Sequence, residues 1–328
     1  MVPFLGAGVN HFGRTGPWER ADVGTLPDGR ELADHLAAVY GYLESMPTVA
    51  VADEAATDGN GREQPPAVST ELLDLARVSQ FVALITDEQQ LYDDLHEIFA
   101  SQYDPNDLHR FFGEFPKLFR ERELAPSYQL IVTTNYDDAL ERALSDQGEE
   151  FDLFYYGADQ HGKGWFWHTK PDGATTQVKD AARYGPDLLE NRPAIVKIHG
   201  AVNRDDRDRD SYVITEDDYI EYLADAGISG LVPAKLKAKM RQSNFLFLGY
   251  SMRDWNVRAF LQRLWSERQR GVQSWAIQLA PDTLERRFWE KRSVEIHEVR
   301  LEEYIDRLRM EVVTLLDGHA PAPIPPGS

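Results

Sequence analysis

The sequence predicts an α/β protein whose core is a parallel sheet flanked by helices. Short apolar runs, typical of buried strands, recur along the 328 residues at Val2 to Leu5, Gln129 to Thr133, Ala194 to Ile198, Asn244 to Leu248 and Ser274 to Leu279. From the second run onward, strand and helix patterns alternate. Such alternation is typical of parallel sheets built from strand-helix-strand units.

The composition indicates a globular protein and excludes several classes of function. Apolar residues make up 42% of the chain, which is enough for a large buried core. The formal charge of −20 repels phosphate backbones, so direct nucleic-acid binding is not expected. No cysteine is present, which rules out disulfides and cysteine-ligated zinc, and no paired histidine spacing predicts a metal site. No apolar run reaches membrane-spanning length and no signal peptide is recognisable, so we expect a cytoplasmic protein.

Between the first two strands, the pattern predicts a mainly helical module over residues 30–125. Its first helix spans Arg30 to Leu43, and a polar segment from 52 to 69 is expected to be a mobile loop. Thr86, with Gln89 three residues later, predicts a capping box at the start of another helix. That helix carries Leu91, Leu95 and Ile98. Two further helices are predicted from apolar stripes at helical spacing, which are Leu72, Leu75, Val78 and Val82, and Phe111, Phe112, Phe115, Leu118 and Phe119.

In the second half, helices are expected after residues suited to capping, namely Asp137, Thr215, Asp254 and Asp282. The charged run 203–210 is expected to be a solvated loop. A last helix, starting near Leu301, should close a domain spanning residues 1–318. The proline-rich tail, 319–328, is expected to act as a stiff linker to a further domain.

Three short motifs directly follow predicted strands, which suggests a single site. They are Gly6-Ala7-Gly8-Val9-Asn10, Thr133-Thr134-Asn135-Tyr136-Asp137 and Lys197-Ile198-His199-Gly200. In an open α/β sheet, the loops that leave the carboxyl ends of the strands converge on one crevice. These motifs are therefore expected to line a common ligand cleft.

Each motif also has a purely local explanation. The glycine pair fits either a tight turn or a close approach of backbone N–H groups to a phosphate. Asn135 could simply cap the following helix, and Asp137 could complement its dipole. His199 could be a core residue or a titratable group in the cleft. Gly249 and Ser251, after the strand at 244–248, fit an anion site, although Asp254 could account for part of that pattern as a cap.

Taken together and in this order, Gly6-Ala7-Gly8-Val9, Thr133 to Asp137, Lys197 to Gly200 and Gly249-Tyr250-Ser251 resemble the motifs of the sirtuin family. The similarity is greatest to the sirtuin-like domains of bacterial antiphage defence proteins and spans almost the whole chain. It implies a Rossmann-type parallel sheet that binds NAD+.

The resemblance also implies a role for each matching residue. Gly6, Ala7 and Gly8 would face the pyrophosphate. Asn135 would hold the nicotinamide ribose or the attacking water, and His199 would hydrogen-bond the ribose hydroxyls. Asp137 would contact the nicotinamide amide, while the other residues assigned to the nucleotide site are Val9, Asn10, Thr134, Gly200, Gly249 and Ser251.

The missing cysteines set this chain apart from sirtuin deacylases, which carry a four-cysteine zinc module. The resemblance therefore implies an NAD+ glycohydrolase that releases nicotinamide and ADP-ribose and depletes NAD+ in abortive infection. A non-catalytic NAD+ or ADP-ribose sensor, a deacylase or ADP-ribosyl transferase, and a cyclase remain alternatives. Expected partners are NAD+ as substrate, further copies of the chain, and a sensor domain or partner protein beyond the tail.

Overall fold

The computed structural model describes residues 1–20, 24–45, 73–124, 128–158, 164–185, 187–224, 228–250, 258, 260–262, 264 and 273–319. The polar segment 52–69, Leu72, Ser251 and Asp254 lie outside these residues. The tail from 320 onward also lies outside them, and the last helix ends at His319. Within the described part of the chain, no helix is both long and apolar enough to cross a membrane.

The core is a nine-stranded sheet in the order β11-β10-β9-β1-β2-β6-β3-β4-β5. Seven strands run parallel, and β4 and β5 are antiparallel at one edge. The strands are β1 (Val2–Leu5), β2 (Leu130–Thr133), β3 (Asp152–Gly157), β4 (Trp165–Thr169), β5 (Thr175–Gln177), β6 (Ala194–Lys197), β9 (Phe245–Leu248), β10 (Ser274–Gln278) and β11 (Val294–Glu298). A separate pair is formed by β7 (Gly200–Ala201) and β8 (Ser211–Tyr212).

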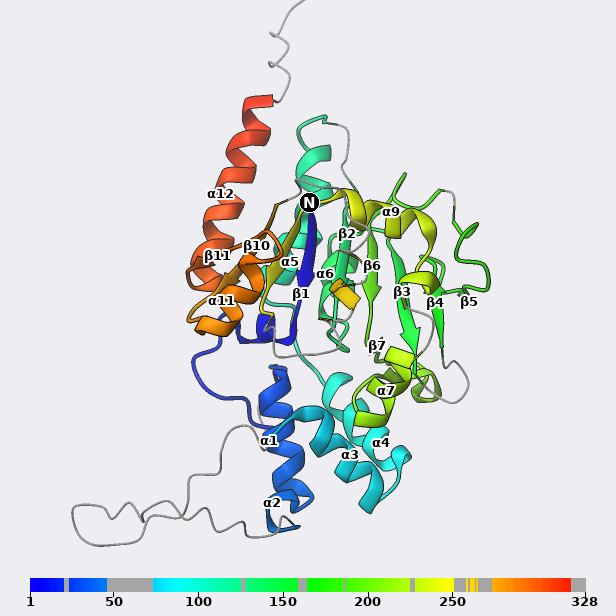
Figure 1. The fold of residues 1–328 in the computed structure, drawn as a ribbon. Coiled ribbons are helices and arrows are strands. Elements are labelled where there is room, and N and C mark those ends of the chain that lie inside the picture. The colour runs from blue at the N-terminus through cyan, green and yellow to red at the C-terminus, as the bar shows by residue number, and fades with distance from the viewer. Residues whose placement is uncertain are drawn as a thin grey trace, which may run out of the picture.

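Helices cover both faces of the sheet, which confirms the predicted α/β fold of the Rossmann type (Figure 1). Apolar side chains of α5 (Asp107–Arg120), α6 (Ala139–Asp146) and α12 (Leu301–His319) pack on one face. The other face is covered by α7 (Glu216–Ala224), α9 (Ala234–Gln242) and α11 (Thr283–Glu290). A short helix, α8 (Ile228–Leu231), precedes α9.

Four further helices of the described part of the chain gather beyond the carboxyl ends of the strands (Figure 1). They are α1 (Gly29–Val39), α2 (Tyr42–Ser45), α3 (Leu75–Ile85) and α4 (Glu88–Phe99). These helices share an apolar core that also includes Tyr136 and Ala139 from the segment after β2. The expected helical module thus divides in two, because α5 packs on the sheet while the rest packs against the loops at its carboxyl edge.

The predicted capping box at Thr86 is wrong. Asp87 is the N-cap of α4 and accepts the amide of Gln90, whereas the Thr86 hydroxyl donates to the Val82 carbonyl and so belongs to the end of α3. Two other predicted starts are confirmed. Thr215 and Asp218 exchange side-chain hydrogen bonds at α7, and Asp282 caps α11.

Four neighbouring strands end in one row at the carboxyl edge. Leu5 is paired with Leu248 on one side and with Thr133 on the other, and Thr133 is paired with Lys197. The four loops that carry the predicted motifs leave the sheet from this row. Their convergence follows directly from the strand order β9-β1-β2-β6.

Helices α5 and α6 touch through Gly113. A Cβ atom at this position would lie 2.3 Å from the Ala143 carbonyl oxygen, closer than any contact distance allows. Because α6 follows directly on the loop after β2, this backbone contact also fixes where that loop ends.

We expect Gly113→Ala to destabilise the protein by about 1–3 kcal/mol, since the added methyl group must push α5 and α6 apart. Gly318→Ala is the matched control, because Gly318 is also helical and no atom lies near its missing Cβ. That control should be neutral or stabilising by up to about 1 kcal/mol. Urea unfolding of both variants measures the difference, and equal effects would contradict the proposed contact.

Candidate active site

The glycine motif after β1 forms a short 3₁₀ helix, η1 (Ala7–His11), whose backbone is pressed against the loop after β9. The Gly8 amide donates to the Gly249 carbonyl at 2.8 Å, and the Gly6 amide donates to the Leu248 carbonyl at 3.0 Å. A Cβ on either Gly6 or Gly8 would lie 2.7 Å from the Gly249 oxygen. Gly249 itself has a φ of +60°. Close backbone packing therefore requires these glycines, whatever ligand binds nearby.

The next residues of η1 differ in their surroundings. Ala7 is half-buried, whereas Val9 is fully buried in the core that the sheet forms with α5, α6 and α12. The Val9 carbonyl accepts a hydrogen bond from the Asn106 side chain at 2.9 Å. Asn10 is 7% exposed and donates from Nδ2 to the Pro27 carbonyl at 3.0 Å. Its Oδ1 has no hydrogen-bond partner among the described residues. Asn10 thus offers a buried acceptor.

Asn135 is fixed by the end of β2. The Thr134 amide donates to the Leu5 carbonyl at 3.1 Å, and the Asn135 amide donates to the Thr133 hydroxyl at 3.0 Å. The N-cap of the following helix is Asp138, so the local explanation of Asn135 as a cap does not hold. The Asn135 side chain is buried, and within the described ranges its Oδ1 has no partner. A buried, unpaired amide oxygen is costly and needs an explanation, such as a ligand or an ordered water.

Asp137 does support the helix, but with only one of its oxygens. Its Oδ1 accepts the Ala139 amide at 3.1 Å at the start of α6. The second oxygen, Oδ2, is buried without a hydrogen-bond partner in the described structure. The carboxylate is therefore positioned by the helix and still has an acceptor to offer.

His199 lies at the end of β6, next to the Asn135 loop. Its side chain is 2% exposed and its ring meets the rings of Tyr219 and Tyr222 edge-on, with centroids 5.8 and 5.6 Å away. The following Gly200 has a φ of +98°, and a Cβ there would lie 2.0 Å from the Ser211 carbonyl oxygen. The glycine lets the chain turn sharply and pair with β8 directly after the histidine.

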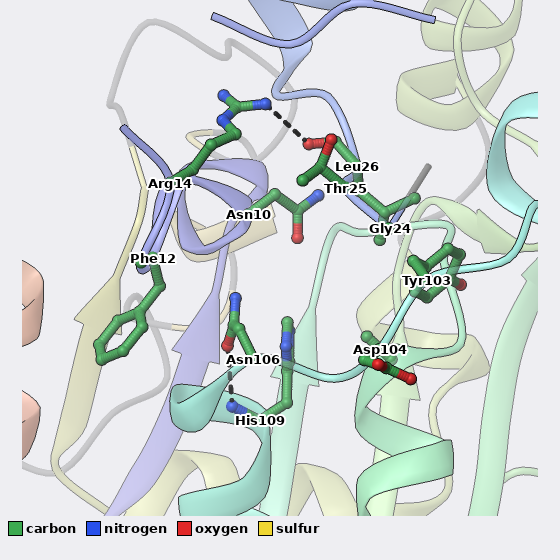
Figure 2. A pocket seen from close by; sticks show the side chains of 12 residues that line it. Asn10, Phe12, Arg14, Gly24, Thr25, Leu26, Tyr103, Asp104, Asn106 and His109 are labelled. Atoms are coloured by element: carbon green, nitrogen blue, oxygen red, sulfur yellow. Dashed lines mark hydrogen bonds between the residues drawn. The ribbon is translucent and has the colours of Figure 1, made fainter. Parts of the chain in front are cut away.

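A pocket of about 210 Å³ opens beside η1. Figure 2 shows Asn10, Asn106 and His109 gathered on one side of it, with Tyr103 and Asp104 across from them. Asn10 is the one predicted site residue among those lining it, and Asn135 and His199 are not. The lining residues are Asn10, Phe12, Gly13, Arg14, Gly24, Thr25, Leu26, Tyr103, Asp104, Asn106, His109 and Ala139.

His109 was missed by the sequence reasoning. It sits on α5 with its side chain 3% exposed, and its Nδ1 has no partner within the described segments. Burial lowers its pKa to about 4, against the attraction of the nearby Asp137 carboxylate. The imidazole is therefore neutral at pH 7. The available sequence signal was Asn106, which caps α5 three residues earlier, and both side chains line the pocket.

A second missed feature lies in the charged run 203–210, where the expectation of a solvated loop holds only for the middle of the run. Asp205 and residues 207–209 are exposed, whereas both ends are tied into the fold. Arg204 pairs with Asp138 at 2.5 Å and also donates to backbone carbonyls at the end of α4. Asp210 is 1% exposed and pairs with His96 at 2.7 Å. The partners are 66 to 114 positions away in sequence, so the local pattern of alternating charges could not reveal them.

Contacts between basic and acidic side chains stabilise one wall of the pocket, to which Arg14 belongs. Arg14 pairs with Glu31 at 2.6 Å, and His11 contacts Asp28 at 2.7 Å. His11, Asp28 and Glu31 lie close enough together to suggest a metal site. The Glu31 oxygens, however, already accept from Arg14 and from the amides of Trp18 and Asp28. These contacts fit a structural role, in which His11 and Arg14 hold the end of η1 and the turn after it against the start of α1.

The lowered pKa of His109 predicts a specific loss of stability in acid. Its folded-state pKa lies below the ordinary value of 6.5, so between about pH 6.5 and 4 the unfolded chain binds more protons and stability falls as the pH falls. In His109→Gln, we expect the slope of the unfolding free energy against pH to fall by the contribution of about one proton over this range. Urea unfolding at several pH values measures it, with exposed His297→Gln as the control. An unchanged slope in His109→Gln would contradict the assignment.

The geometry can be compared with known protein families. A family model described as "SIR2-like domain" matches residues 129–297, which is just over half of the chain and includes Asn135, Asp137, His199 and Gly249. No curated protein matches the chain significantly. Members of this family are in general NAD-dependent enzymes. The extent of the match and the α/β fold agree, and the chain belongs to the SIR2-like domain family.

Proposed function

We propose that the protein is an NAD+ glycohydrolase that cleaves NAD+ to nicotinamide and ADP-ribose. The observation that supports this most strongly is the Asn135 side chain. It is buried at the carboxyl edge of the sheet, does not cap a helix, and has an amide oxygen without a partner in the described structure. A buried acceptor on a loop whose backbone is fixed by hydrogen bonds is suited to orienting a water molecule or a ribose hydroxyl.

The reaction breaks the bond between C1′ of the ribose and the nicotinamide nitrogen. The bonding electron pair leaves with nicotinamide, and positive charge develops on the ribose. A water oxygen then bonds to C1′ and a proton is released. Asn135 would orient the water or the ribose, His199 would hydrogen-bond the ribose hydroxyls, and Asp137 would hold the carboxamide of the leaving group. Such a reaction depends on positioning and electrostatics and needs no covalent nucleophile.

The surroundings of the site support a ligand that carries a carboxamide on a heteroaromatic ring. Asn10, which lines the pocket, and Asp137, on the Asn135 loop, each supply an unpaired acceptor, which suits the N–H₂ group of a carboxamide. His109 is neutral at pH 7 and therefore adds no positive charge beside a pyridinium ring. Deacylation is less well supported, because the cysteine-free chain has no zinc module of the deacylase type.

We further propose that the enzyme acts in antiphage defence by depleting NAD+ and that it works as a homo-oligomer. Both parts rest on the resemblance to defence-associated sirtuin-like domains. A phage-responsive partner or domain would then control the activity.

Asn135→Ala and His199→Ala are each expected to abolish nicotinamide release from NAD+, since each removes a group that positions the reacting ribose or water. Loss of one positioning group costs about 10²-fold or more in rate. Chromatographic separation of the products over time measures the rate. Two exposed residues supply matched controls, Asn191→Ala and His297→Ala, which should keep the wild-type rate.

The same product analysis separates the proposal from its rivals. Free ADP-ribose with equimolar nicotinamide supports hydrolysis. A cyclised nucleotide or O-acyl-ADP-ribose would replace the proposed reaction with cyclisation or deacylation. Tight NAD+ binding without any product would identify a sensor. Near-normal turnover in either Asn135→Ala or His199→Ala would show that the site is wrongly assigned.

Oligomer-dependent activity predicts that nicotinamide release per molecule rises with protein concentration. We expect dilution to lower the specific activity as the assembly dissociates, which light scattering coupled to gel filtration can follow on the same samples. A monomer with constant, full specific activity at every concentration would contradict this proposal.

A further inference from the structure

Lys197 is a buried charge at the edge of the candidate active site. It is the last residue of β6 and only 1% exposed. Ile195, two residues earlier on the same face, packs in the core formed with α5 and α6. Lys197 therefore lies between the sheet and the N-terminal ends of these two helices, directly behind the Asn135 loop.

The ammonium group makes all its observed contacts with one short segment. It donates to the Tyr136 carbonyl at 3.3 Å and also to the Asp137 carbonyl. Its counter-ion is Glu141 on the first turn of α6, with Nζ and Oε1 2.5 Å apart. The two carbonyls belong to the loop that carries Asn135 and Asp137. One side chain therefore binds two successive peptide units of that loop.

Stability alone is a poor reason for this arrangement. Removing an ammonium group from water costs several kcal/mol, and a buried ion pair often stabilises no more than apolar residues of similar size. The positive end of the α6 dipole also lies close to the ammonium. Burial raises the pKa of Glu141 to about 7 in spite of Lys197, and Glu141 Oε2 has no hydrogen-bond partner in the described part of the protein. Burying this pair therefore costs folding free energy.

We infer that Lys197 is a positioning residue, which clamps the carbonyls of Tyr136 and Asp137 and so fixes the loop that presents Asn135 and Asp137 to the substrate. Glu141 serves as the buried counter-ion of the clamp. The catalytic consequence rests on the proposed function, whereas the clamping of the loop does not. Neighbouring contacts agree with a loop held in place, since the Asp138 amide donates to the Tyr103 hydroxyl at 3.0 Å and Val202 donates to the Tyr136 carbonyl at 2.9 Å.

Three variants separate clamping from charge pairing. Lys197→Met removes both the clamp and the pair. Glu141→Gln removes the ion pair but leaves the ammonium on the two carbonyls. The double variant Lys197→Met/Glu141→Leu removes the clamp without leaving an unpaired buried charge, which should recover stability lost by Lys197→Met. Each is compared with the wild type by urea unfolding, by amide hydrogen exchange across residues 133–139, and by NAD+ turnover.

We expect exchange in this segment to be at least about tenfold faster in Lys197→Met and in the double variant, and near wild type in Glu141→Gln, because the clamp and not the pair restrains the loop. In the double variant, kcat should fall by about 10²-fold with a smaller change in KM, since a misplaced loop mainly affects the transition state. Glu141→Gln should retain most of kcat.

Opposite results would overturn the inference. Wild-type exchange and kcat in a folded double variant would show that the loop needs no clamp. Failure of the double variant to fold, with no unpaired charge left, would assign Lys197 to stability instead. If the wild-type protein does not cleave NAD+, the proposed function fails, but hydrogen exchange still decides whether Lys197 restrains the loop.

Discussion

The structure depends on one row of backbone pairing across four strands. Leu248, Leu5, Thr133 and Lys197 are aligned at the carboxyl edge, so every chain segment leaving this row enters the same narrow region. The contact of Gly8 with Gly249 closes one side of that region, and hydrogen bonds from Thr134 to Leu5 and from Ile198 to Thr133 extend the row by one residue. A cleft residue on one loop is thereby placed relative to residues more than a hundred positions away.

Unpaired polar atoms at this edge of the sheet also lower the stability of the folded protein. Buried acceptors without a hydrogen-bond partner within the described structure include Oδ1 of Asn10, Oδ1 of Asn135 and Oδ2 of Asp137. Each unpaired buried polar atom costs about 1–3 kcal/mol. The cost is met by the apolar packing around them, because Val9 and Tyr136, their immediate neighbours in sequence, belong to two large buried clusters. Concentrating unpaired groups in a rigid frame is what a binding site requires.

Strands could be predicted from the sequence where a local run of apolar residues coincides with burial inside the sheet. The five predicted strands are apolar because they lie inside the sheet, and they are confirmed. Among the missed strands, β11 is mixed in character, because Glu295 and His297 alternate with Val294 and Ile296 at the exposed edge. β3 is an exception, since it is an apolar, buried strand inside the sheet. Motif order was enough to identify the family and to bring Asn135 and His199 to one edge. His109, the Lys197–Glu141 pair and the Arg204–Asp138 pair escaped because each depends on a partner that only the tertiary fold supplies.

The glycines show why motif and mechanism must be argued separately. Gly6, Gly8 and Gly249 are the residues that a sequence comparison notices first. The backbone packing already requires them, because a Cβ atom on any of the three would lie 2.7 Å or less from a backbone atom. Loss of activity on replacing them would therefore reveal nothing about phosphate binding, because the strand-end loops would also move. Evidence for a ligand lies instead in side chains whose polar atoms the fold positions but does not satisfy. Asn135 is the clearest case, since its backbone is held by Thr133 while its amide oxygen has no partner among the described residues.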